Sequence, residues 1–167
     1  MWRAPKDSAV ATVRCDVTVE DDVARLVDAA VERFGRLNIA FANAGTASLG
    51  RVVDLAVHEW SRVLDVNLTG PMLTIKHAAR RMERGGSIVA TASLNAVQAG
   101  AGMGAYCVSK AGVAMLVQVA AIELTLLSSI RLGRACVPGM RAGKWGRVIF
   151  LTSMAANVIS IVVVVLV

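Results

Sequence analysis

Aromatic residues and cysteines are both scarce in this chain of 167 residues. Only 4% of the residues are aromatic although 56% are hydrophobic, a balance that suits an α/β interior rich in valine and alanine and excludes a disordered chain. The three cysteines, Cys15, Cys107 and Cys136, are odd in number and lack the spacing of metal ligands. We therefore expect reduced, mostly buried thiols in a cytoplasmic protein, with neither disulfides nor a bound metal.

Concentrated charge is missing as well. The net charge is +6, yet the basic residues are scattered, and the tightest cluster, Arg80, Arg81 and Arg84, includes Glu83. Cations of this kind are typical of a helix C-terminus, so we expect no nucleic-acid partner. The first residues are polar and lack the apolar stretch of a secretory signal peptide.

The C-terminal stretch, residues 148–167, contains no charged residue and follows Arg141, Lys144 and Arg147. Its length would span a membrane, and the basic flank suits a tail anchor. Its β-branched residues equally suit strands. We predict a strand over 148–152 and a second buried or edge strand over 161–167, with the membrane anchor as the alternative.

Upstream of this stretch the pattern alternates between strands and helices. Gly35 should end the first helix, and Thr18 with Asp21 should form a capping box at its start. The predicted strands are 9–15, a buried strand at 37–42, and a run ending near Ser93. The predicted helices run from 18 to 34, around 60–68, and from Tyr106 to about Leu127, and the whole order indicates an α/β fold with a parallel sheet.

Three residues carry the chemistry that the sequence suggests. Tyr106 and Lys110 are four residues apart, so that on a helix both side chains project from one face. A lysine ammonium beside the phenol would favour the tyrosinate, which makes Tyr106 a candidate general acid and base. Ser93, thirteen residues before Tyr106, ends a strand-like run, and its hydroxyl could hold a substrate oxygen.

This set resembles the short-chain dehydrogenase/reductase family, whose signature is a serine followed thirteen residues later by Tyr-x-x-x-Lys. Residues 41–45 resemble the family's Asn-Ala-Gly element, and residues 65–70 resemble the segment that supplies its catalytic asparagine, here Asn67. The resemblance implies a partial doubly wound Rossmann-type sheet flanked by helices within residues 1–140. Residues within 129–137 resemble the family's next strand, and Pro138 and Gly139 resemble the Pro-Gly turn that follows it. Residues 141–167 look like a second copy of the serine-bearing strand.

The resemblance also implies an NAD(P)-dependent oxidoreductase that moves a hydride between nicotinamide and a secondary alcohol or ketone. Tyr106 would donate the proton, and Lys110 would lower the pKa of Tyr106 and contact the nicotinamide ribose. Ser93 would hold the carbonyl oxygen, and Asn67 would support a proton relay. The cofactor groove would be lined by Asp16, Val17, Asn43, Ala44, Gly45, Tyr106, Lys110, Pro138 and Gly139. Because family members commonly pair through the helix that bears the tyrosine, a homo-oligomer is expected.

One family element has no counterpart in this sequence. No glycine-rich phosphate loop precedes Asp16, and the resemblance covers only residues 9–139. In a sheet of order 3-2-1-4-5-6, the two unrepresented strands would lie between those at 9–15 and 37–42. We therefore expect weak or absent binding of NAD or NADP, and a non-catalytic fragment of the family is the second hypothesis.

Overall fold

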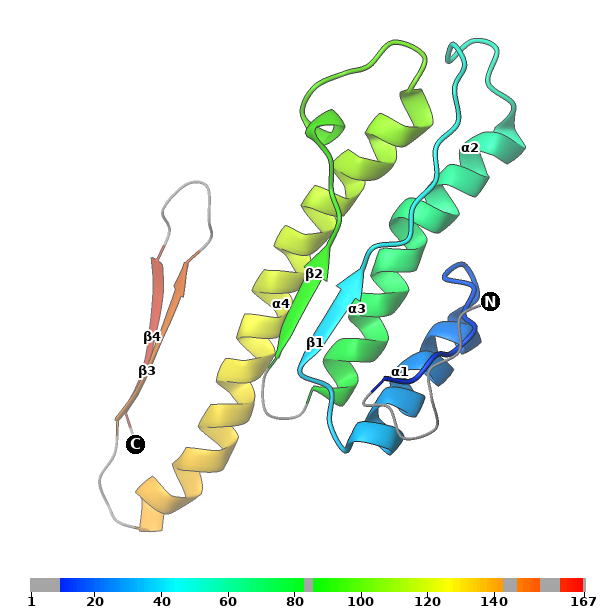
Figure 1. The fold of residues 1–167 in the computed structure, drawn as a ribbon. Helices are drawn as coiled ribbons and strands as arrows, with labels where there is room; N and C mark the ends of the chain where they lie inside the picture. Colours follow the sequence, from blue (N-terminus) through cyan, green and yellow to red (C-terminus); the bar gives the residue numbers. More distant parts are fainter. Residues whose placement is uncertain (1–9, 83–85, 143–146, 154–159, 167) are drawn as a thin grey trace. The chain divides into compact units, whose positions relative to one another are not determined.

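The computed structural model describes residues 10–82, 86–142, 147–153 and 160–166 (Figure 1). Contacts divide the chain into two compact units, Met1–Val117 and Gln118–Val167. In chain order the elements are α1 (Glu20–Phe34), β1 (Ile39–Ala42), α2 (Val57–Leu64), a π-helical turn (Asp65–Thr69), α3 (Gly70–Arg81), β2 (Ser87–Ala90), a short 3-10 turn (Leu94–Ala96), α4 (Gly104–Ala142), β3 (Arg147–Ser153) and β4 (Ser160–Leu166).

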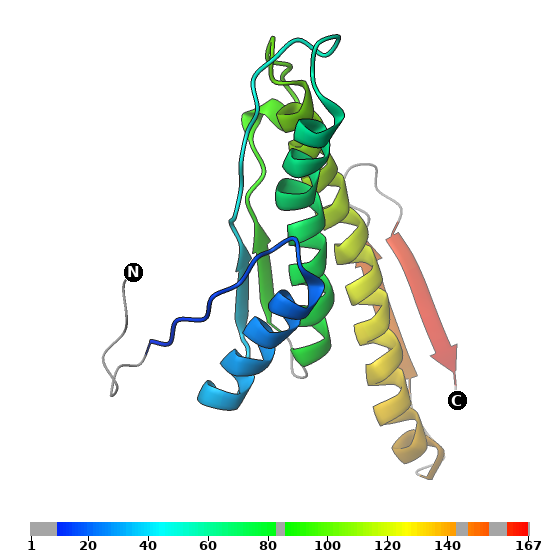
Figure 2. The same cartoon turned by 90° about the vertical axis from the view of Figure 1, so that its right-hand side faces the viewer.

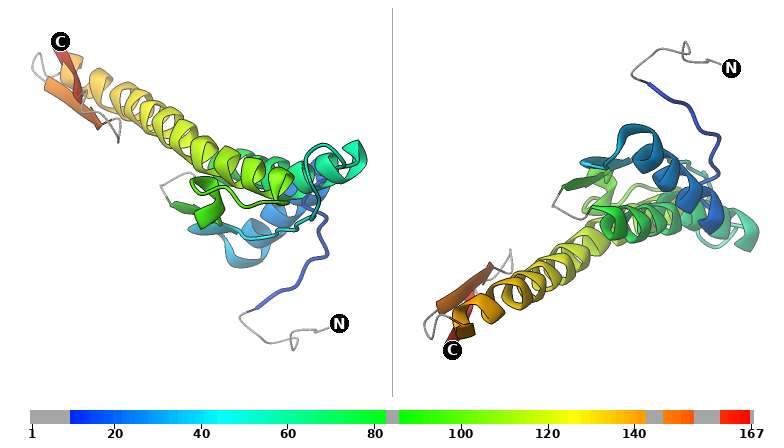
Figure 3. Two further views of the ribbon diagram at one scale, coloured as in Figure 1. Left: turned by 90° about the horizontal axis from the view of Figure 1, so that it is seen from above. Right: turned by 90° about the horizontal axis from the view of Figure 1, so that it is seen from below.

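The sheet of the first unit consists of β1 and β2, which run parallel with Ile39 opposite Ser87 and Ala42 opposite Ala90. Helix α3 contacts both strands. Figures 2 and 3 show α3 and the first turns of α4 on one side of the two strands. The predicted α/β class with a parallel sheet is therefore confirmed.

The other face of this sheet is exposed. Side chains of successive strand residues alternate between faces, so Ile39 and Phe41 share a face with Val89 of the neighbouring strand. These three residues are 68%, 60% and 48% exposed, whereas Ala42 on the opposite face is buried. The expectation of a buried strand over 37–42 was therefore wrong for one face, because no described element covers it.

The predicted strand over 9–15 is wrong for residues 10–15, which form no strand, and Ala9 lies outside the described residues. A strand needs a hydrogen-bonded neighbour for its backbone groups, and no described strand pairs with this segment. The segment instead leads through a turn at 16–19 into α1, whose N-cap is Val19 without a side-chain cap. The predicted Thr18–Asp21 capping box was therefore also wrong.

Helix α1 ends where the sequence indicated. Gly35 has a φ of 78°, the left-handed conformation that glycine adopts without the steric cost of a Cβ, and its N–H bonds the carbonyl of Val31. Val23 and Val27 are the buried residues of this helix. α1 packs against α3, and salt bridges from Lys76 to Glu20 and from Arg81 to Asp28 link the two helices.

Helix α4 begins at Gly104 and continues to Ala142, well beyond the predicted end near Leu127. The expected strand within 129–137 and the Pro-Gly turn at 138–139 are wrong, because these residues are helical and Pro138 lies inside the helix. A helix satisfies its own backbone groups, whereas a strand here would need a partner.

By length and composition Gly104–Leu124 could cross a membrane, a test that core helices of soluble proteins also pass.

The second unit contains the antiparallel pair β3 and β4, in which Arg147 lies opposite Leu166 and Ser153 opposite Ser160. The predicted strand ending near Ser153 is confirmed, and so is a strand over 161–166, while Val167 lies outside the described residues. The described residues of 148–167 therefore form two strands and not a single membrane-spanning helix.

Candidate functional site

The carboxyl ends of β1 and β2 meet at Asn43 and Thr91, the first residues after the two strands. The Thr91 N–H donates to the Ala42 carbonyl at 3.0 Å, and the Thr91 hydroxyl donates to Asn43 Oδ1 at 2.8 Å. Lys110 Nζ donates to the Thr91 carbonyl oxygen at 2.7 Å. Thr91 therefore connects the two strand ends to a lysine on α4. Sequence reasoning missed Thr91, although the rule that ligands lie at strand carboxyl ends would have indicated it.

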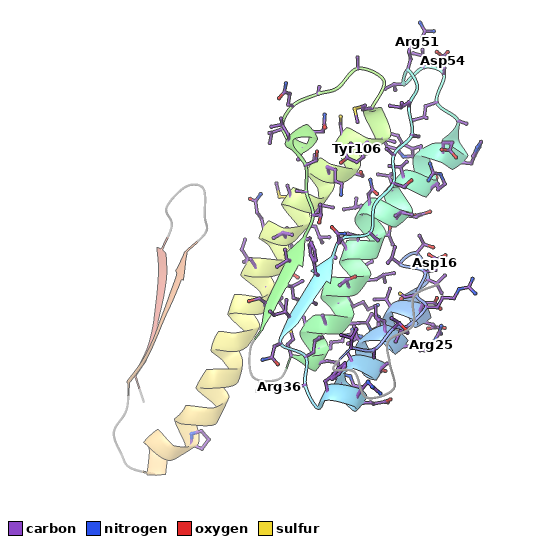
Figure 4. The ribbon with its side chains drawn as sticks, viewed as in Figure 1. Asp16, Arg25, Arg36, Arg51, Asp54 and Tyr106 are labelled. Carbon is purple, nitrogen blue, oxygen red and sulfur yellow. The ribbon has the colours of Figure 1, made fainter. Side chains whose placement is uncertain are left out.

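Tyr106 and Lys110 project from the first turns of α4. Figure 4 shows Tyr106 beyond the carboxyl ends of β1 and β2, where the loops after these strands lie. Lys110 is only 3% exposed, and its Nζ lies 5.8 Å from the centroid of the Tyr106 ring. The four-residue spacing therefore brings the ammonium and the phenol side by side, as expected for a helix.

Ser93 lies two residues beyond Thr91 in extended backbone that leads into the 3-10 turn. Its hydroxyl accepts a hydrogen bond from the Asn95 N–H at 3.1 Å and donates to Asn95 Oδ1 at 3.4 Å. Asn95 Nδ2 in turn donates to the Gln98 carbonyl. Asn95, which the sequence analysis did not single out, thus contacts both Ser93 and the segment that leads from the 3-10 turn to α4.

Asn67 is completely buried in the π-helical turn between α2 and α3. Its Oδ1 accepts from the Thr46 N–H at 2.7 Å, and its Nδ2 donates to the Thr46 carbonyl at 2.8 Å and to Ser109 Oγ at 3.0 Å. The side chain is therefore occupied in holding the segment after β1. Both Nδ2 hydrogens of Asn67 are used in these contacts.

Gly45 lies where the asparagine and the lysine approach each other. A Cβ at this position would lie 3.5 Å from Asn67 Oδ1 and 3.8 Å from Lys110 Nζ. Asn43, Ala44 and Gly45 are themselves exposed. The segment after β1 is therefore an open surface beside a buried ammonium, which suits the approach of a ligand to the backbone.

An open hollow of about 670 Å³ lies beside this segment. Its lining combines three predicted cofactor residues with residues that sequence reasoning missed: Asp16, Val17 and Ala44, and then Arg14, Cys15, Asp22 and Arg25. Asp22 and Arg25 are three residues apart on α1, and this spacing could have indicated them from the sequence.

Hydrogen bonds order the acidic side of the hollow. Asp16 Oδ1 accepts from the N–H and hydroxyl of Thr18, and these bonds hold the pKa of Asp16 below its usual value. Asp22 accepts from the Asp16 N–H at 2.9 Å and pairs with Arg25, which together lower the pKa of Asp22. Both carboxylates therefore stay ionised in neutral solution.

The thiols differ from expectation. Cys15 and Cys107 are partly exposed rather than buried, and the side chain of Cys136 lies outside the described part of the chain. Partial burial, with the neighbouring Asp22 and Asp16, raises the pKa of Cys15. Among the described residues no group of three or more histidine, cysteine and acidic side chains could hold a metal ion.

A close contact places Val17 at the hollow. A Cβ on the buried Gly70 would lie 3.1 Å from Val17 Cβ, tighter than an ordinary van der Waals contact. Glycine at the start of α3 therefore lets the turn before α1 approach the helix.

Pro138 and Gly139, the last predicted cofactor residues, lie in α4 within the second unit and not in a turn after a strand.

A parallel two-stranded sheet flanked by helices, with Ser93 and Tyr106 in segments beyond its carboxyl ends (Figure 4) and Lys110 bonded to Thr91, is a partial Rossmann-type α/β domain. The sequence model described as enoyl-(acyl carrier protein) reductase matches residues 3–126. The chain is 47% identical to momilactone A synthase of Oryza sativa subsp. japonica over 116 residues, and 43% identical to secoisolariciresinol dehydrogenase of Forsythia intermedia over the same length. The chain belongs to the short-chain dehydrogenase/reductase family.

Solved structures agree with this assignment. A short-chain type dehydrogenase/reductase from Mycobacterium marinum has a TM-score of 0.66 and 37% identity, over 68% of this chain and 47% of its own. NAD⁺-bound xylitol dehydrogenase has a TM-score of 0.64 and 37% identity, over 66% and 44%. Both named plant relatives are matched over 67% of this chain and 42% of their own length, so the chain spans less than half of either.

The residues present fit a dinucleotide only in part. The hollow beside Asp16 and Val17 is open, and the backbone at Gly45 beside Lys110 is exposed, so both are accessible to a ligand. A pyrophosphate needs a glycine-rich turn at a helix N-terminus. None of the described residues ahead of α1 is glycine, so no such turn lies among them.

Proposed function

We propose that this domain serves an NAD(P)-dependent oxidoreductase reaction on a secondary alcohol or ketone. The observation that supports it most directly is the buried Lys110 ammonium, which lies against the Tyr106 ring and is tied through Thr91 to both strand ends. The family membership and the dehydrogenase names of its relatives support the same reaction class.

In this proposal Tyr106 transfers a proton to or from the substrate oxygen through its phenolic hydroxyl. The ammonium of Lys110 stabilises the phenolate, which accepts the hydroxyl proton when the alcohol is oxidised and forms again when the phenol protonates a ketone oxygen, since opposite charges in a buried site attract strongly. Ser93 holds the substrate oxygen by a hydrogen bond, which its hydroxyl gains by releasing Asn95 Oδ1. The bound nicotinamide supplies or accepts the hydride.

Asp16 and Val17 would hold the adenine end of the dinucleotide, and Asn43, Ala44 and Gly45 would lie along its middle. The exposed short side chains of this segment allow the backbone to approach the ligand. Lys110 would bond the ribose hydroxyls beside Gly45.

A second candidate is a domain of this family that does not turn over substrate. The uncovered sheet face at Ile39, Phe41 and Val89 favours it. In that case exposed apolar surfaces such as this sheet face mediate association with other copies or partners, and Tyr106 transfers no proton.

Turnover assays separate the two. The purified chain is incubated with NAD⁺ or NADP⁺ and a panel of secondary alcohols, and reduced nicotinamide is followed by absorbance. The oxidoreductase proposal expects activity that Tyr106→Phe and Ser93→Ala reduce by about 10²-fold or more, the scale of a lost general acid. Ser61→Ala, a change at an exposed serine on α2, is the matched control and should retain activity. Absence of turnover with every alcohol, in protein with intact helical circular dichroism, favours the second candidate.

A further inference from the structure

The segment of residues 43–47, here called the Asn43–Ala47 loop, is exposed from Asn43 to Gly45 and again at Ala47. Thr46 within it is held on several sides. Asn67 takes up both backbone polar groups of Thr46, and the hydroxyl of Thr46 accepts a hydrogen bond from Arg62 Nη1 at 2.8 Å. The hydroxyl of Thr46 is thus bound by a residue of α2, whereas its backbone groups are bound by Asn67 in the π-helical turn.

Arg62 also reaches the next residue of the loop. Its Nη2 donates to the Ala47 carbonyl at 3.2 Å, so one guanidinium contacts a side chain and a backbone carbonyl of adjacent residues. A planar guanidinium with several N–H groups in fixed directions can hold two such acceptors at once, which a lysine ammonium cannot reproduce.

The guanidinium is itself oriented by Glu59, one turn earlier on α2. Arg62 Nε donates to Glu59 Oε1 at 3.1 Å, and Nη2 donates to Oε2 at 2.8 Å. The same pairing lowers the pKa of Glu59. The side chains are 43% and 35% exposed, so the ion pair by itself contributes little stability, and its effect lies in fixing direction.

We propose that Arg62, oriented by Glu59, is a positioning residue that fixes the Asn43–Ala47 loop in the path that presents its backbone to a dinucleotide. Asn67 anchors this loop from the buried side, and Arg62 anchors it from the solvent side. The role assigned to the loop rests on the proposed function, whereas the fixation itself does not.

The chain offers a matched control for this residue. Arg51 also forms an ion pair with an acid three residues away, Asp54, at 2.7 Å, and both side chains are exposed. Figure 4 labels this pair near the loop that follows β1. Arg51 makes no described hydrogen bond to residues 43–47, so Arg51→Met removes a comparable ion pair without releasing the loop.

Amide hydrogen exchange, read residue by residue by NMR, tests the proposal in the full chain. Arg62→Met should accelerate exchange of the Thr46 amide by about tenfold, the effect of losing two hydrogen bonds of ordinary strength in a local opening. Exchange in α3 should stay within about twofold of the wild-type rate. Arg62→Lys should behave like Arg62→Met at the loop, because it keeps the charge without the two fixed contacts.

A double-mutant cycle with Thr46→Val shows whether the hydroxyl carries the effect. The acceleration by Arg62→Met should be clearly smaller in the Thr46→Val background, because one of its two contacts is already missing. Equal exchange at Thr46 in the Arg62→Met and Arg51→Met proteins would overturn the proposal, and so would full additivity in the cycle.

Adding NADH to the same samples distinguishes this inference from the proposed function. Increased protection of residues 44–47 in the wild-type protein supports the cofactor role of the loop. A loop that NADH leaves unchanged, but that Arg62→Met still releases, contradicts the cofactor role while the positioning by Arg62 stands.

Discussion

Lys110 Nζ donates a hydrogen bond of 2.7 Å to the backbone carbonyl of Thr91, the residue that directly follows β2. Because the Thr91 hydroxyl also bonds Asn43 after β1, a lysine on a helix is tied to the ends of both strands. The position of the ammonium is therefore set by the sheet as well as by the helix that bears it.

Lys110→Met should lower the free energy of unfolding by about 1 to 3 kcal/mol, the range for hydrogen bonds to charged groups, because it leaves the Thr91 carbonyl without its donor. Urea denaturation measures this. Lys76→Met is the control, since Lys76 forms an exposed pair with Glu20 and should cost less than about 1 kcal/mol. Equal losses in the two variants would show that the Lys110 contact contributes no more than a surface ion pair.

Asn67→Ala should lower the free energy of unfolding further, by about 3 kcal/mol. It leaves the Thr46 N–H and carbonyl without their hydrogen-bond partners next to a fully buried position. The measurement is again the urea midpoint. Asn38→Ala, at an exposed residue before β1, should change stability by less than about 0.5 kcal/mol. Wild-type stability in the Asn67 variant would mean that the loop relaxes without cost.

A polypeptide of these 167 residues should bind NADH weakly, because no glycine-rich turn precedes Asp16 to cradle the pyrophosphate. Adenine and ribose contacts alone remain. Isothermal titration calorimetry with NADH and NADPH checks this, with adenosine as the control ligand. A micromolar dissociation constant for either dinucleotide would contradict the prediction.

Stability should fall at acid pH through the carboxylates before and within the first turn of α1. The pKa of Asp22 is lowered by the Asp16 N–H and by Arg25, so its folded-state pKa lies below the unfolded value. The stabilisation is present above about pH 4 and is lost as pH falls through the folded pKa. At about pH 6 the urea midpoint of Asp22→Asn should lie below that of wild type. At about pH 3 the difference between the two proteins should be smaller, because Asp22 is then increasingly protonated in wild type too. Asp21→Asn, in the same turn, is the control, and a difference from wild type that does not shrink on acidification would refute this assignment.

Self-association through α4 is a further proposal. Val108 and Met115 are 48% and 59% exposed and lie seven residues apart on the helix, so they share one face. Burying such a face in a second copy is favourable. Light scattering after size exclusion should show a dimer or larger species, which Met115→Glu shifts towards monomer while Met72→Glu on α3 does not. A monomer at every concentration would remove this proposal.

The sequence alone determined the features that depend on neighbours along the chain. Helical spacing placed Tyr106 beside Lys110, Gly35 ended α1 in a left-handed conformation, and the β-branched C-terminal run formed strands. Each of these follows from local backbone geometry or side-chain periodicity. The roles assigned to the site residues stay predictions until activity is measured.

Only the tertiary structure decided which apolar runs became strands and which polar groups met. Residues 10–15 resemble a strand in sequence but have no described partner, and residues 129–137 are helical for the same reason, since a helix needs no neighbour for its backbone hydrogen bonds. The contact of Arg62 with Thr46 joins residues sixteen positions apart, and that of Lys110 with Thr91 joins residues nineteen apart. Local patterns carry no information about such contacts, because they arise only when separate elements pack together.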